Sequence, residues 1–166
     1  MTVRKGRFTA SPERDFVVFL IGMRFNKPWK VHQWLPVARA MPPMLRVLRE
    51  YPELGCLGSH QWVARTTILV QYWESFEHLE RFARDEHLPH LEPWRRFNRA
   101  VRNSGDVGVW HETYKVRAGE FEAVYANMPA FGLAAATKHV PIALIGQSSA
   151  ERLGVPNPEP PAVESY

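Results

Sequence analysis

Two segments of the chain are apolar at both odd and even positions, and this pattern limits its fold more than any other feature. They are residues 16–25 and 66–73, both rich in β-branched and aromatic side chains. Such side chains favour strands, whose successive residues point to opposite faces of a sheet. Both faces of each strand are therefore apolar, and we expect a sheet that must be covered on both sides.

The order of the predicted elements narrows the fold further. Apolar residues at helical spacing predict helices at residues 31–51, after Ser75 and at residues 91–102, and strand patterns cover residues 16–25, 66–73, 107–116 and 120–127, with a short strand ending at Trp62. Up to residue 116 the order is β-α-β-β-α-β, with the second α in two pieces. That order is typical of a four-stranded antiparallel sheet with helices on one face. We therefore predict an α+β, ferredoxin-like domain.

Prolines set two further expectations. Pro42 and Pro43 lie within the first helical pattern, and each lacks the backbone N–H that a helix interior needs. We expect that helix to break or kink near Ala40. Prolines also crowd the end of the chain, so we predict one domain over residues 15–140 and an extended or flexible tail over residues 141–166.

Composition excludes several classes of protein. The chain has 166 residues, enough for one buried core, and its single cysteine, Cys56, cannot form an intramolecular disulfide. The longest apolar run is about eight residues, against the roughly 20 that a membrane helix needs. The net charge of +4 is scattered among acidic residues, and the basic start of the chain is not followed by a signal-peptide pattern. We expect a cytoplasmic protein that binds neither membrane nor nucleic acid.

Helices on one face would leave the other face of the sheet apolar and uncovered. The predicted strands are apolar at both odd and even positions, as in residues 17–21 and 68–73, so that uncovered face is apolar too. Large exposed apolar patches commonly mark an interface. If two copies packed these faces against each other in a two-fold dimer, the apolar face of each sheet would be buried, so we expect a homodimer.

Several unusual strings carry a family resemblance. They lie in Phe19–Trp29, Leu69–Trp73, Trp94–Asn98, Gly108–Tyr114 and Val124–Pro129. Over residues 15–140 the chain resembles the fumagillin-pathway monooxygenase-like family, formerly a domain of unknown function (DUF4188). The resemblance implies the antibiotic-biosynthesis-monooxygenase type of dimeric α/β barrel. That fold includes cofactor-independent oxygenases, haem-degrading enzymes, haem peroxidase-like proteins and aldoxime dehydratases, so it implies a reaction only weakly.

His111 is the strongest candidate catalytic residue. Its imidazole could take a proton from a substrate or bind a haem iron, or it could instead form a hydrogen bond within the core or the dimer seam. Alternation along the strand puts His111 and Glu112 on opposite faces. Arg24 could hold a carboxylate or an oxyanion of the substrate, or it could pair with Glu112 or with a carboxylate on a helix.

A second group of residues would position a substrate. Tyr125 and Asn127 are candidates, and Asn127 would either orient a substrate carbonyl or cap the turn at Pro129. Aromatic and apolar side chains suit a ligand pocket, although tryptophans more often belong to the core. The candidate pocket residues are Trp29, Trp73, Trp110, Tyr114 and Met128.

His87 and His90 are spaced three residues apart, which would put both on one helical face if Pro89 is tolerated there. Either could be an axial ligand in a haem-binding relative, and a surface position is the alternative. No third ligand of the kind that metal sites use stands beside them, so we predict no metal site.

These observations favour a monooxygenase-like enzyme acting on a hydrophobic, aromatic or polyene small molecule. The sequence has no glycine-rich dinucleotide fingerprint, P-loop or serine-hydrolase elbow. Two alternatives stay open: a haem enzyme of the same fold, of the peroxidase, haem-degrading or aldoxime-dehydratase type, and a non-enzymatic ligand-binding dimer. The expected cofactor is accordingly none or haem.

Overall fold

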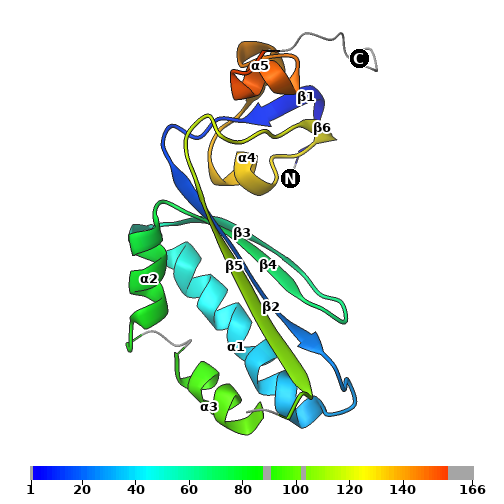
Figure 1. The fold of residues 1–166 in the computed structure, drawn as a ribbon, viewed down its shortest axis with the longest axis vertical. Coiled ribbons are helices and arrows are strands. Elements are labelled where there is room, and N and C mark those ends of the chain that lie inside the picture. Colours follow the sequence, from blue (N-terminus) through cyan, green and yellow to red (C-terminus); the bar gives the residue numbers. More distant parts are fainter. Residues whose placement is uncertain (1, 88–90, 102–103, 157–166) are drawn as a thin grey trace. The chain divides into compact units, whose positions relative to one another are not determined.

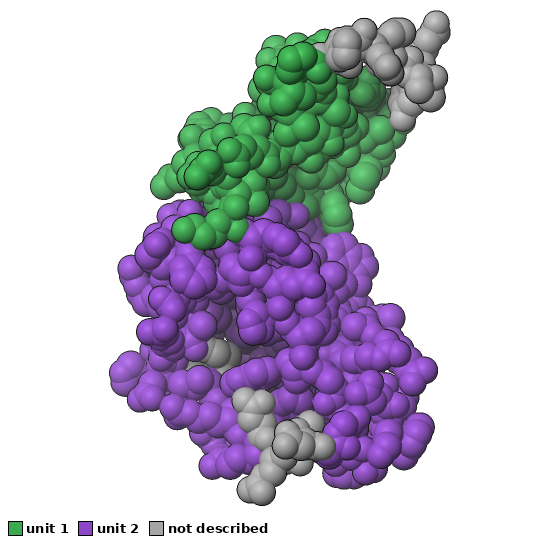
Figure 2. Space-filling model, in the orientation of Figure 1, with its two compact units in different colours: residues 1–16, 115–166 green, residues 17–114 purple. Residues whose placement is uncertain are grey.

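The computed structural model describes residues 2–87, 91–101 and 104–156. These residues divide into two compact units, coloured separately in Figure 2. One unit combines both ends of the chain, residues 1–16 and 115–166, and the other is continuous over residues 17–114. We call them the terminal unit and the central unit. Each contains one β-sheet.

The central unit is built on a four-stranded sheet in the order β3-β4-β2-β5. Its strands are β2 (Phe16–Phe25), β3 (Cys56–Trp62), β4 (Ile68–Trp73) and β5 (Val107–Val116). β4 pairs antiparallel with both β2 and β3, and its Trp73 lies opposite Val17. In chain order this sheet reads second, third, first and fourth strand, which is the ferredoxin-like arrangement. The prediction of an α+β fold of this kind is confirmed.

Three helices cover one face of this sheet (Figure 1). They are α1 (Val31–Glu50), α2 (Phe76–Arg84) and α3 (Leu91–Val101), with a short 3-10 turn, η1 (Pro52–Leu54), after α1. The predicted cap of α2 is present, since the Ser75 side chain accepts a hydrogen bond from the backbone N–H of His78.

The predicted break in the first helix is wrong, because α1 is continuous over 20 residues and contains Pro36, Pro42 and Pro43. The two halves of α1 pack against different parts of the core: Val37 lies against one cluster and Met44 against another. Keeping the helix intact lets both halves pack at once. That burial outweighs the backbone hydrogen bonds that prolines cannot make.

Two apolar clusters fill the space between the helices and the sheet. The first contains Val17, Leu48, Trp73, Leu79 and Phe82, and the second contains Met23, Phe97 and Val107. In β4 the odd-numbered residues are buried and the even-numbered ones are half-buried. Odd-numbered residues of β2, β4 and β5 therefore face the helices, and even-numbered ones face the open side of the sheet.

Cys56 packs against the first cluster as a small apolar residue. Burial raises the pKa of its thiol to about 11. A protonated thiol is a poor nucleophile, so this cysteine is structural rather than reactive.

The terminal unit has a three-stranded sheet in the order β6-β1-β7. Its elements are β1 (Arg4–Ala10), β6 (Tyr125–Met128), α4 (Gly132–Ala136), β7 (His139–Pro141), η2 (Ile142–Leu144) and α5 (Ser149–Leu153). The sequence did not predict β1, and the strand expected at residues 120–127 begins only at Tyr125. Part of the segment expected as a tail, residues 141–156, contains η2 and α5.

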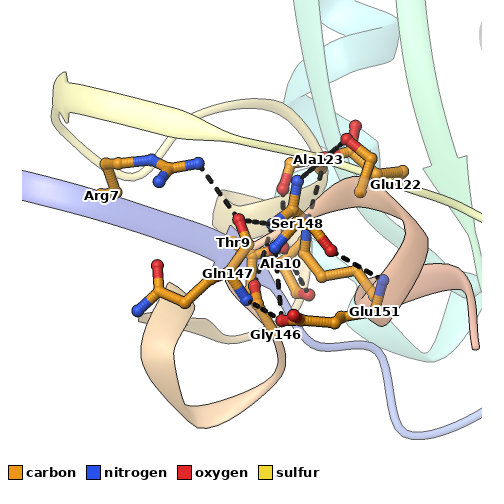
Figure 3. A network of polar contacts seen from close by, with 11 residues as sticks. Arg7, Thr9, Ala10, Glu122, Ala123, Gly146, Gln147, Ser148 and Glu151 are labelled. Atoms are coloured by element: carbon orange, nitrogen blue, oxygen red, sulfur yellow. Dashed lines mark hydrogen bonds and ion pairs between the residues drawn. The ribbon is translucent and has the colours of Figure 1, made fainter. Parts of the chain in front are cut away.

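A polar network holds α5 in the terminal unit (Figure 3). The Arg152 side chain is 4% exposed, and its Nε lies 3.0 Å from Glu122 Oε1. The same guanidinium donates to the backbone carbonyls of Gly146 and Gln147, each at 2.9 Å. Ser148 and Glu151 complete a capping box at the start of α5.

Within the described ranges, no helix is both long enough and apolar enough to cross a membrane.

Candidate functional site

The clearest candidate site lies beside β5, the edge strand of the central sheet. Val107 faces the helices and is buried with Phe97, so Val109 and His111 have the same orientation. Yet Val109 is 39% exposed and His111 is exposed. The helices thus cover β5 only at its start.

His111 lies on this uncovered part of β5. Its ring centroid lies 5.9 Å from that of Phe19, which packs against the first core cluster. We call the partly exposed surface formed by Phe19, Val109 and His111 the β5 recess. It combines an accessible imidazole with two apolar side chains, which is a chemistry suited to holding an apolar ligand next to a proton acceptor.

Arg24 and Trp110 lie on the other face of the sheet. A Cβ atom added to Gly22 would lie 2.8 Å from Trp110 Nε1, so this tryptophan covers the even-numbered side of β2. Arg24 is exposed, and its Nη1 donates to Thr66 Oγ1 at 2.7 Å. The structure therefore does not bring either residue together with His111. Trp110 Nε1 is buried and has no hydrogen-bond partner within the described part of the chain.

The other aromatic candidates of the central unit are dispersed. Trp73 is 0% exposed in the first core cluster, and Trp29 is 73% exposed. Tyr114 donates a hydrogen bond of 2.6 Å to Glu112, and this bond raises the pKa of Tyr114. The Tyr114–Glu112 contact also means that Glu112 has a partner other than Arg24.

Three candidates belong to the terminal unit, on β6. Asn127 has a backbone φ of 53° and accepts a hydrogen bond of 2.9 Å from Gly6 N–H, which ties β6 to β1. Tyr125 is half-buried, burial raises its pKa, and its hydroxyl accepts from the Ala134 N–H. Met128 is 37% exposed. These contacts support a structural role for Asn127.

Of the two remaining candidate histidines, the structure describes only His87. His87 is exposed, and its backbone N–H donates to Asp85. His90 lies outside the described residues. Across the described ranges, no three His, Cys, Asp or Glu side chains are grouped so as to hold a metal ion.

A buried carboxylate that the sequence did not indicate lies at the start of β5. Asp106 is 2% exposed and forms ion pairs with Lys27 at 2.7 Å and Lys30 at 2.6 Å. Hydrogen bonds from Lys27, Lys30 and Gln33 lower the pKa of Asp106 to about 2. The cluster joins the β2–α1 connection to β5. Its lysines and aspartate are more than 70 positions apart, so no local motif reveals it.

Comparison with known proteins finds a match to one protein family and to solved structures. The family model described as "Monooxygenase af470-like" matches residues 16–133. A relative named monooxygenase af470, from Aspergillus fumigatus, is 31% identical over an alignment of 121 residues that covers 67% of this chain. The chain spans only 42% of the length of that relative.

Two crystal structures of aldoxime dehydratases have a similar fold. One, named OxdRE and in complex with butyraldoxime, superposes with a TM-score of 0.64 at 18% identity, over 78% of this chain and 39% of the other. The second superposes with a TM-score of 0.63 at 20% identity, over 78% of this chain and 40% of the other. At this level of identity the likeness concerns the fold alone.

Proposed function

The chain belongs to the monooxygenase af470-like family, as the resemblance in its sequence indicated, and on that premise we propose that it is a monooxygenase-like oxidoreductase. Its substrate would be a hydrophobic, aromatic or polyene small molecule bound in the β5 recess. One observation carries this assignment: the accessible imidazole of His111 stands on the helix-facing side of the sheet against Phe19.

His111 would act as the general base. Imidazole is the side chain best suited to taking up a proton near neutral pH. With an electron-rich phenol, His111 would take the phenolic proton, and the phenolate would pass electrons to dioxygen. One oxygen atom would enter the ring and the other would leave as water, so that phenol and dioxygen give quinone and water. This four-electron oxidation of the substrate needs no external reductant.

Oxygen uptake by the purified chain with an electron-rich phenol tests this role. We expect His111→Ala to lower the uptake at least about 100-fold while the fold is retained, since general acid–base groups contribute 10²–10⁴-fold. His87→Ala removes another exposed histidine of the same unit and serves as the matched control. Unchanged turnover in His111→Ala would refute the assignment.

Haem binding is the alternative within the same recess. His111 would bind the haem iron, and Phe19 and Val109 would supply apolar contacts to the porphyrin. Haem would supply an iron centre able to bind and activate a ligand. A titration with hemin distinguishes the two: a Soret shift that His111→Ala removes supports haem, and its absence supports cofactor-free oxygenation. A chain that shows neither a Soret shift nor oxygen uptake would be the non-enzymatic ligand binder.

We also propose a homodimer formed through the open face of the central sheet. The half-buried side chains of Val18, Leu20 and Val70 share that face with Trp62, which is 45% exposed. A charge placed among them, as in Leu20→Glu, would then dissociate the dimer in sedimentation velocity. A monomeric wild-type chain would refute this.

A further inference from the structure

A groove between α1 and α3 is another place in the central unit where a ligand could bind. It has a volume of about 570 Å³, which is in the range of sites for small molecules. Its lining residues are His32, Gln33, Pro36 and Val37 from α1, and Glu92, Arg96 and Phe97 from α3. None of them belongs to the β5 recess.

The base of the groove is apolar and firmly packed. Phe97 is 4% exposed and belongs to the second core cluster with Met23 and Val107. Val37 packs against the same cluster from α1. An apolar ligand would therefore lie on side chains whose positions the core already fixes.

Gln33 adds one polar group with a defined orientation. Hydrogen bonds from Lys27, Lys30 and Gln33 all act on the carboxylate of Asp106. The Gln33 side chain thus lies beside Asp106, and an ionised carboxylate can accept a hydrogen bond only from its NH₂ group, so Oε1 is the atom left to accept one from a ligand. Oε1 is buried and has no hydrogen-bond partner in the described part of the chain. A buried acceptor without a donor is costly.

Charges at the rim of the groove are already matched. Glu92 accepts from Arg96 at 2.9 Å and from Arg99 at 3.4 Å, and the bond from Arg96 is the main reason that its pKa is lowered. A charged ligand would have to compete with these pairs. A neutral ligand would leave them intact.

We propose that the groove between α1 and α3 is a second ligand site, which takes a neutral, mainly apolar molecule whose hydroxyl or amide group donates a hydrogen bond to Gln33 Oε1. The terminal torsion of a glutamine side chain is soft. A small rotation would turn Oε1 toward the ligand while the NH₂ group stays with Asp106.

Two probes of the same shape test the proposal on the full chain. 2-Naphthol carries one hydroxyl donor, and 2-methoxynaphthalene lacks it. We expect 2-naphthol to bind about tenfold more tightly, with amide chemical-shift changes in ¹⁵N-labelled protein centred on α1 and α3. Gln33→Leu should bind both probes equally, whereas Gln61→Leu, which changes an exposed glutamine of β3, should keep the preference.

Pro36→Trp provides a test that does not touch Asp106. Pro36 is exposed, so a larger ring there would fill the groove while restoring a helical N–H. Both probes should lose binding, and the spectrum should remain dispersed. His111→Ala should leave the preference unchanged, which separates this proposal from the proposed function. Equal affinities in the wild type, or shifts centred on Phe19, Val109 and His111, would overturn it.

Discussion

Gly22 in β2 offers the sharpest test of the packing between the strands of the central sheet. A methyl group there would lie 2.0 Å from the backbone carbonyl oxygen of Thr67 and 2.8 Å from Trp110 Nε1. Ordinary contacts of a Cβ atom begin near 3.4 Å. Gly22→Ala must therefore displace backbone, and not merely rotate a side chain.

We expect Gly22→Ala to lower the free energy of unfolding by an amount at the top of the range for overpacked variants. Such substitutions usually destabilise by 1–3 kcal/mol, and we expect about 3 kcal/mol here because the obstacle is a carbonyl group of a neighbouring chain segment. Gly108 in β5 is the matched control, since a methyl group there would lie 3.6 Å from Arg24 Cβ. Gly108→Ala should stabilise by about 0.4–1 kcal/mol, through the lower entropy of the unfolded chain.

Urea unfolding monitored by tryptophan fluorescence measures both changes, with the free energy extrapolated linearly to water. Removing the indole in the double variant Gly22→Ala, Trp110→Ala should not restore stability, because the contact with the Thr67 carbonyl remains. A Gly22→Ala variant within 0.5 kcal/mol of the wild type would refute this account of the strand contact. Full rescue by Trp110→Ala would refute the part assigned to the carbonyl.

Three further predictions concern charged and titratable groups. Arg152→Met should destabilise the chain by about 3 kcal/mol in the same unfolding assay, since it removes the ion-pair partner of Glu122 and two hydrogen bonds to backbone carbonyls. The surface change Arg96→Met should destabilise it by less than about 0.5 kcal/mol. The pKa of Asp106 is lower in the folded state than in the unfolded chain, so the stabilisation by its ionised carboxylate should be complete above pH 3.8 and should decline toward about pH 2. Melting curves of Asp106→Asn should lack this decline. Burial and the charge of Arg4 lower the pKa of His139 in the folded state, so the stability of the chain should fall as the pH drops below 6.5. A His139→Phe variant that keeps the full pH dependence would contradict this.

Features carried by short stretches of sequence were predictable. The apolar runs of β2 and β4 predicted central strands, and Ser75 predicted the start of α2. Alternation along the β5 segment predicted that odd- and even-numbered residues lie on opposite faces of the strand, and the structure has His111 on one face and Trp110 on the other. In each case the physical signal lies within about ten residues.

Features that depend on distant partners were not predictable. β1 reads as a basic, polar segment, and it becomes a strand only because residues 125–128 and 139–141 pair with it. The ion pairs of Asp106 and the groove at Gln33 likewise require the folded chain. Helix α1 continues past Pro42 because of the core contacts on either side, which no local propensity contains.

The terminal unit has a consequence for the order in which the chain acquires structure. β1 is the middle strand of its sheet, but both of its neighbours, β6 and β7, come after residue 124. During synthesis, β1 leaves the ribosome before both of these strands and has neither to pair with until the whole central unit has followed it. Because pairings between distant residues form slowly, we expect the central unit to be protected early from amide exchange and β1 to be protected last.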